Sequence, residues 1–146
     1  MCLSRIRSQV LVALAVAVVA GTASRSAAAR TAPPRAARKW EVKMITQDGK
    51  QVFVPAQLTI QVGDTVSWLA VSGSHNVGFW PDSVPKGAVE ILRRAMPDTV
   101  APLLGMRKPK KGDTYQVVFA GVPKGLYRYY CKPHLNKTMV ATLTIK

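Results

Sequence analysis

Acidic residues are scarce in this chain of 146 residues, which holds 7 Asp and Glu against 21 Lys and Arg and carries a formal net charge of +14. The imbalance persists from Trp40 onward, where 14 basic and 7 acidic residues give a net charge of 14 − 7 = +7. A surface field of this sign favours an acidic partner. The basic residues are scattered and form no recognisable module with aromatic residues, which argues against nucleic acid as that partner.

Long apolar runs are also missing. Residues 10–20 form an uninterrupted apolar stretch of 11 residues, whereas a membrane-spanning helix needs about 20. Arg5 and Arg7 precede this stretch and small residues follow it, which is the pattern of a secretory signal peptide. We therefore predict a signal peptide over residues 1–23, with cleavage after Ala23 or Ala29, no permanent membrane anchor, and a periplasmic or otherwise extracytoplasmic location.

Residues 24–39 contain no large apolar side chain. Such a segment cannot bury enough surface to offset the conformational entropy lost on ordering. We predict a disordered tether or a cleaved remnant here, and a single folded domain over residues 40–146, a length typical of one domain.

Cysteine is almost absent. Cys2 falls within the predicted signal peptide, so the mature chain keeps Cys131 alone and cannot form an internal disulfide. In an oxidising compartment, a lone cysteine is either a free thiol at risk of oxidation or a group occupied by a metal or by chemistry. This gives the first indication of a ligand.

Segments of strand length with period-two alternation dominate the chain after residue 40. In one of them Leu58, Ile60 and Val62 share a face. About seven or eight short strands in this length predict an all-β fold, an antiparallel sandwich of two sheets. The predicted strands include residues 40–45, 52–54, 57–62, 65–70, 114–119, 125–131 and 141–145.

One stretch, residues 82–112, departs from the strand pattern. Within it, residues 87–96 place Ala88, Ile91 and Leu92 at helical spacing, and Pro97 ends the pattern. We predict a short amphipathic helix, followed by a loop rich in proline and glycine and by a basic cluster of Arg107, Lys108, Lys110 and Lys111.

Potential metal ligands gather near the C-terminus, in the run YYCKPHLNKTMVATLTI, where Cys131, His134 and Met139 stand at positions i, i+3 and i+8. Two imidazoles, one thiolate and a weak, distant methionine make up the trigonal site of electron-transfer copper proteins. The chain has 2 histidines, so the second imidazole can come only from His75. Zinc would also suit histidine and cysteine, but Met139 favours copper.

Chance is a weak explanation for this spacing, with a probability on the order of one in a thousand for a given motif. Taken alone, His75 in the polar stretch SGSHN would more often be a solvated loop residue, in about three cases of four. When the Cys131 motif is taken into account, a ligand role for His75 becomes the better interpretation.

The segments GDTVSWLAVSGSHNVGFW and GLYRYYCKPHLNKTMVATLTI together resemble the cupredoxins, in particular the plastocyanin, amicyanin and pseudoazurin group of small blue-copper proteins. The resemblance covers residues 40–146. It implies a Greek-key β-sandwich with one copper ion near one end, bound by His75 Nδ1, Cys131 Sγ, His134 Nδ1 and Met139 Sδ. It also implies that the electron leaves through the solvent-facing edge of His134.

Several neighbours of the predicted ligands bear on this resemblance. Asn76 resembles the family residue whose backbone N–H reaches the cysteine sulfur, and Pro133 has no N–H to add as a further donor. Lys132 stands where family members often carry a small hydroxyl residue, which puts the usual bond to Asn76 in question. Residues 82–112 form a longer stretch than in the most compact members, either a partner surface or a covering flap.

Three functions compete. Transport of single electrons between redox partners by a monomer is preferred, and the charge alone suggests an acidic c-type cytochrome or a membrane oxidase as partner. Copper carriage or buffering would be favoured by Met-rich or His-rich tracts, which the sequence lacks. An enzyme with a Cys-His nucleophile needs an orienting third group, which nothing marks, so we expect no enzymatic activity. Tyrosines 127, 129 and 130 are interpreted as packing residues rather than an electron relay.

Overall fold

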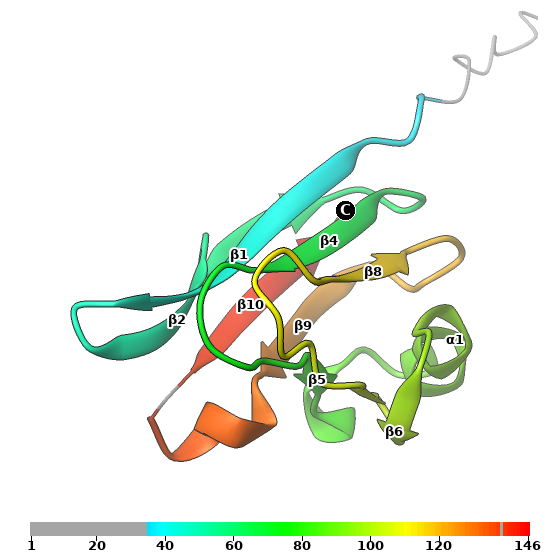
Figure 1. Cartoon of the computed structure of the whole chain (residues 1–146). Helices are drawn as coiled ribbons and strands as arrows, with labels where there is room; N and C mark the ends of the chain where they lie inside the picture. The colour runs from blue at the N-terminus through cyan, green and yellow to red at the C-terminus, as the bar shows by residue number, and fades with distance from the viewer. Residues whose placement is uncertain (1–34, 138) are drawn as a thin grey trace, which may run out of the picture. The chain divides into compact units, whose positions relative to one another are not determined.

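Two β-sheets form the domain in the computed structural model, which describes residues 35–137 and 139–146 (Figure 1). The predicted signal peptide and most of the predicted tether lie outside these residues. The first sheet has the strand order β2 (Lys50–Val54), β1 (Lys39–Gln47), β4 (Thr65–Ala70) and β8 (Thr114–Val118). The second has the order β3 (Gln57–Ile60), β10 (Val140–Ile145), β9 (Gly125–Tyr130), β5 (Gly78–Phe79), β7 (Leu104–Gly105) and β6 (Thr99–Ala101).

The predicted all-β sandwich with one short helix is confirmed, but the pairing is not purely antiparallel as expected. β1 runs parallel to β4, with Trp40 opposite Val66, and β10 runs parallel to β3, with Leu143 opposite Leu58. The alternation of apolar residues decides which face of a strand is buried but not the direction of its neighbour.

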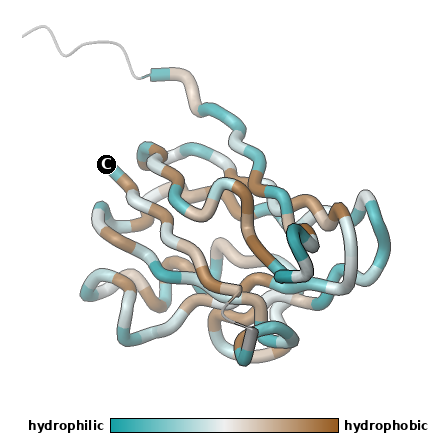
Figure 2. The backbone as a smooth tube through the Cα atoms, turned by 90° about the vertical axis from the view of Figure 1, so that its left-hand side faces the viewer, coloured by the Kyte–Doolittle hydropathy of each residue, from teal (hydrophilic) through white to brown (hydrophobic). Residues whose placement is uncertain are grey.

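The core lies between the sheets and follows the period-two pattern. In β4, Val66, Trp68 and Ala70 are fully buried while the residues between them are partly exposed. Hydrophobic and hydrophilic stretches alternate along the chain accordingly (Figure 2). Trp68 packs edge-on against Tyr129, with ring centroids 5.5 Å apart. Tyr127 is also fully buried, so the interpretation of these two tyrosines as packing residues is confirmed.

The residues just before Trp40 contact the domain. β1 starts at Lys39, and the preceding residues are tied to Asp64, whose side chain is 1% exposed. The Asp64 carboxylate pairs with Arg35 and accepts hydrogen bonds from the Arg38 backbone N–H and the Trp40 indole, each at 2.9 Å. A buried carboxylate thus binds residues 35–38 through hydrogen bonds that the apolar pattern does not reveal, and the extent of the predicted tether stays a prediction.

The expected helix is α1 (Ala88–Ala95), preceded by a short 3₁₀ turn at Pro81–Ser83. Instead of the expected loop, the chain after α1 forms β6 and β7, which extend the second sheet beyond β5 (Figure 1). Tyr115 anchors this region by donating a hydrogen bond to the Pro97 carbonyl at 2.7 Å. A Cβ atom on Gly105 would lie 2.4 Å from the Tyr115 ring, so the close packing requires glycine there.

Among the described residues, no helix is long and apolar enough to cross a membrane.

Candidate metal centre

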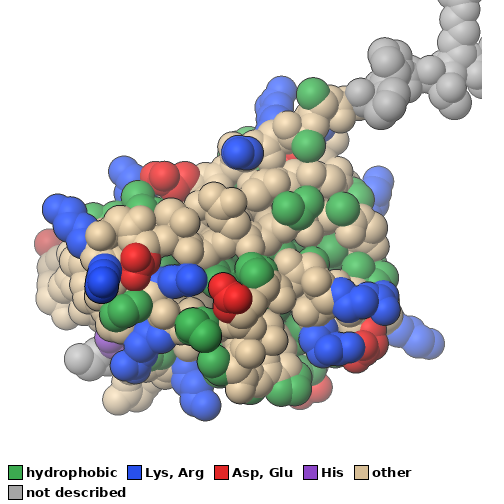
Figure 3. Space-filling view, turned by 45° about the vertical axis from the view of Figure 1, so that its right-hand side comes forward, with side chains coloured by type: hydrophobic (Ala, Val, Ile, Leu, Met, Phe, Trp, Pro, Cys, Tyr) green, Lys and Arg blue, Asp and Glu red, His purple; other side chains and the backbone are tan. Residues whose placement is uncertain are grey.

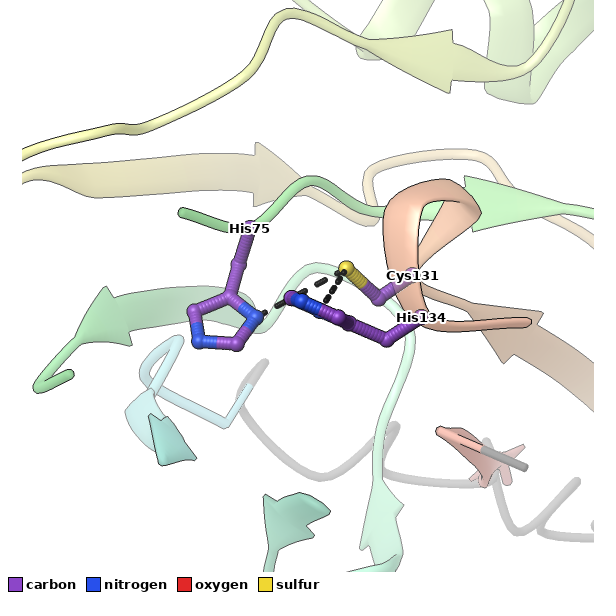
Figure 4. A group of neighbouring side chains, drawn as sticks. All are labelled: His75, Cys131 and His134. Atoms are coloured by element: carbon purple, nitrogen blue, oxygen red, sulfur yellow. Dashed lines mark hydrogen bonds between the residues drawn. The ribbon is translucent and has the colours of Figure 1, made fainter. Parts of the chain in front are cut away.

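Three of the four predicted ligands meet at one end of the sandwich. The Cys131 Sγ atom lies 3.6 Å from His75 Nδ1 and 3.4 Å from His134 Nδ1, and the three potential ligand atoms all lie within 4.8 Å of one another. Figure 4 shows both imidazoles turned toward the sulfur. The sequence separates His75 from Cys131 by 56 positions, so the fold assembles the group.

His75 is held by its backbone and by its ring. Its backbone exchanges two hydrogen bonds with Lys108, at 3.2 and 2.7 Å, and its Nε2 lies 2.5 Å from the Ser72 carbonyl oxygen. A carbonyl can only accept, so Nε2 carries the proton and Nδ1 keeps a free lone pair directed at Cys131. Burial lowers the pKa of His75, partly offset by the bond to Ser72, which favours the neutral ring that a metal requires.

The other predicted ligands share the loop between β9 and β10. The Cys131 N–H donates to the Met139 carbonyl at 3.1 Å, and the Met139 N–H donates to the His134 carbonyl at 3.3 Å. The His134 N–H donates a hydrogen bond to the Cys131 carbonyl at 3.1 Å. Met139 is 1% exposed. These hydrogen bonds close the loop, so backbone contacts fix the positions of Cys131, His134 and Met139.

Burial raises the pKa of the Cys131 thiol, because a desolvated thiolate is unfavourable. The backbone N–H groups of Asn76 and His134 and the charge of Arg107 oppose this shift. The expected contact between Asn76 and the sulfur is thus present, and His134 supplies a second donor that Pro133 cannot.

Asn76 also organises the loop through its side chain. Its Oδ1 atom accepts a hydrogen bond of 2.9 Å from the backbone N–H of Lys132, and the residue is 5% exposed. The doubt that Lys132 raised about a bond to Asn76 is therefore resolved, because the donor belongs to the backbone and does not depend on the side chain.

The two histidines differ in exposure. His75 is fully buried, whereas His134 is partly exposed, and the ring centroids lie 5.0 Å apart. The space-filling view shows a histidine side chain at the surface, with Lys and Arg side chains close to it (Figure 3).

The donor set fits copper. A buried thiol facing two imidazole Nδ1 atoms combines a soft sulfur ligand with two nitrogen ligands, a combination that suits copper. The Ser72 carbonyl orients the ring of His75, and Asn76 holds the backbone next to Cys131, so the ligands are positioned before a metal binds.

The fold and this site define a blue-copper protein, and comparison with known proteins gives the same class. The chain belongs to the plastocyanin/azurin family of copper binding proteins, which matches residues 40–146. Members of this family are copper-binding electron carriers with a single copper ion.

Individual relatives support the assignment. The chain is 32% identical to a plastocyanin of Nostoc punctiforme over 115 residues, 78% of each chain, and 35% identical to that of Vicia faba over 106 residues, 72% of this chain and 98% of the relative. A solved pseudoazurin of Methylobacterium extorquens AM1 is 26% identical with a TM-score of 0.53, covering 73% of this chain and 74% of that one. For fold alone, the plastocyanin of the fern Dryopteris crassirhizoma reaches a TM-score of 0.57 at 24% identity, covering 73% and 99%.

Proposed function

We propose that this protein carries single electrons between redox proteins in the periplasm or an equivalent extracytoplasmic space. In this proposal His75, Cys131, His134 and Met139 bind the copper ion, with Met139 as the weak axial ligand. The observation that carries the proposal is the convergence of the Cys131 sulfur and two imidazole Nδ1 atoms, at 3.6 and 3.4 Å, in a buried end of the sandwich.

Copper supplies the redox chemistry when bound, by alternating between Cu(II) and Cu(I). The protein keeps the ligand side chains in fixed positions. His75 is fixed by the strand-like pairing with Lys108 and by Ser72, and the Cys131 loop is closed by its own backbone bonds. A framework that moves little between the two oxidation states keeps the reorganisation on electron transfer small.

The partly exposed His134 provides the path to a partner. Its Nδ1 atom faces the Cys131 sulfur and the residue is partly exposed, so it joins the buried ligands to solvent across one side chain. The excess of basic residues suggests an acidic partner, such as a c-type cytochrome or a membrane oxidase. The small size of the domain favours a monomer.

The visible absorption spectrum of the Cu(II)-loaded protein tests the proposal. We expect an intense band in the red part of the visible range, because a thiolate bound to Cu(II) gives a charge-transfer transition, and we expect its loss in Cys131→Ser. Met139→Leu should keep the band and change the reduction potential, since an axial ligand tunes the potential. Met106→Leu is the matched control and should change neither. A colourless Cu(II)-loaded wild-type protein would contradict the electron-transfer assignment and would favour zinc binding or copper carriage instead.

A further inference from the structure

A groove lies over the metal-ligand loop, on the side formed by the segment between α1 and β8. Its volume is about 540 Å³. Lys132 and Pro133, which separate Cys131 from His134 in the chain, form one wall. The remaining lining residues are Asn76, Val100, Leu104, Met106 and Arg107. We call these seven residues the insertion groove.

Apolar side chains of the insertion groove are exposed. Val100 is 60% exposed and Met106 is 48% exposed, and both rank among the exposed large hydrophobic residues of the described chain. Such residues grouped beside a redox site are typical of an interaction surface. Leu104, 4% exposed, forms part of the groove through the short strand β7.

The charged residues of the insertion groove all have one sign. Arg107 and Lys132 line it, and none of the seven lining residues is acidic. The basic run continues beyond the groove through Lys108, Lys110 and Lys111. A basic surface of this extent exceeds what a small ligand would contact, and it complements a protein with an acidic face.

The insertion groove adjoins the residues that hold His75 and those that hold Cys131. Arg107 precedes Lys108, whose backbone exchanges two hydrogen bonds with His75. On the opposite wall, Asn76 accepts the hydrogen bond from Lys132. An occupant of the groove therefore contacts structures that hold His75 and Cys131.

We propose that the insertion groove is the docking surface for an acidic redox protein, which inserts an apolar side chain between Val100 and Met106 and places carboxylates against Arg107 and Lys132. The proposal rests on the electron-transfer function and adds to it the surface and the chemistry of the partner. Of the two readings of residues 82–112, it selects the partner surface over the covering flap.

Stopped-flow reduction of the Cu(II) protein by a reduced c-type cytochrome of net negative charge tests this assignment. We expect Arg107→Gln to lower the bimolecular rate constant about three-fold at low ionic strength, with the difference disappearing at high salt. Val100→Ser should lower it by a similar factor of about three at both ionic strengths, because it removes apolar contact rather than charge.

Matched controls separate docking from general effects. Arg94→Gln removes an exposed charge from α1, and Val118→Ser removes a valine that is 50% exposed on β8. Both should leave the rate constant within about 1.5-fold of wild type at moderate salt, as expected for surface positions outside the contact. Reduction by hydroquinone, a small neutral reagent, should be equal in all variants.

Three outcomes would overturn the docking assignment. The groove variants could react like the controls, or they could slow hydroquinone to the same degree, which would place the effect on the metal centre itself. A concentration-dependent dimer of the wild type, abolished by Val100→Ser in gel filtration, would assign the groove to a second copy of the chain. Failure of the electron-transfer function is distinguishable, because the wild type would then lack the red band and would not accept an electron even from hydroquinone.

Discussion

Replacing Asp64 with asparagine should destabilise the fold by about 3 kcal/mol at neutral pH. The Asp64 carboxylate accepts hydrogen bonds from the Arg38 N–H, the Trp40 indole and the Gln61 N–H, and it pairs with Arg35. Its two oxygens divide these four partners equally. An asparagine keeps one oxygen and turns an NH₂ donor toward the other two donors. Two hydrogen bonds to a charged acceptor are lost, each contributing about 1.5 kcal/mol.

The effect should also depend on pH. Burial alone would raise the pKa of Asp64, but the hydrogen bonds from Arg38, Trp40, Gln61 and Arg35 outweigh burial and hold that pKa well below its ordinary value of 3.8. A carboxyl group whose pKa is depressed by folding stabilises the fold above its unfolded pKa, and the stabilisation is lost as the pH falls through the folded pKa. The gap between wild type and Asp64→Asn should therefore be full at pH 7 and narrow below about pH 4.

Urea unfolding of the metal-free, reduced protein measures this difference without the contribution of metal binding. Asp82→Asn is the control, because Asp82 is exposed and should change the free energy of unfolding by less than about 0.5 kcal/mol. A variant Asp64→Asn as stable as Asp82→Asn at pH 7, or a gap that stays constant into acid, would refute the reasoning.

Three further substitutions follow from contacts described above. Asn76→Ala should weaken copper binding about ten-fold, measured by competition with a chelator, because the Lys132 N–H loses the acceptor that orders the loop. Gly105→Ala should destabilise the domain by about 2 kcal/mol in urea unfolding, since the new Cβ would overlap the buried Tyr115 ring. Tyr127→Phe should cost about 1 kcal/mol in the same assay, through loss of the hydrogen bond from the hydroxyl to the Pro123 carbonyl.

The substitutions of Asn76 and Tyr127 each have a comparison variant that isolates the cause. Asn136→Ala changes an exposed asparagine on the same loop and should leave copper affinity unchanged. Tyr130→Phe removes a hydroxyl from the same strand as Tyr127, but from a residue that is only partly buried, and should be nearly neutral. Wild-type copper affinity in Asn76→Ala, or wild-type stability in Gly105→Ala, would show that the contact contributes little.

Much of the scaffold could be predicted because its strands bury one face. The alternation in Thr65–Ala70 predicted both ends of β4 correctly. The apolar spacing around Ile91 predicted each end of α1 within one residue. β5, β6 and β7 were missed because strands of two or three residues carry no period. The direction of β1 and β3 was missed because a periodic pattern is the same in parallel and antiparallel pairs.

The metal site was predictable to the extent that side-chain chemistry defines it. Cys131, His134 and His75 come together as their residue types and spacing indicated, and the ligand role of Met139 stays a prediction. The contacts that orient the site were not predictable, because the Ser72 carbonyl and the Lys132 N–H belong to the backbone and any residue type could provide them. The role of Asp64 was hidden for a related reason, since an aspartate after a glycine also suits an ordinary turn.

The position of the ligands along the chain has a consequence for how the protein is made. His75 lies near the middle of the chain, whereas Cys131, His134 and Met139 all lie within the loop that ends at β10. A chain synthesised only as far as β9 carries His75 but none of the ligands of the Cys131 loop. The folded centre therefore cannot form before β10 has been synthesised and has paired with β9 and β3.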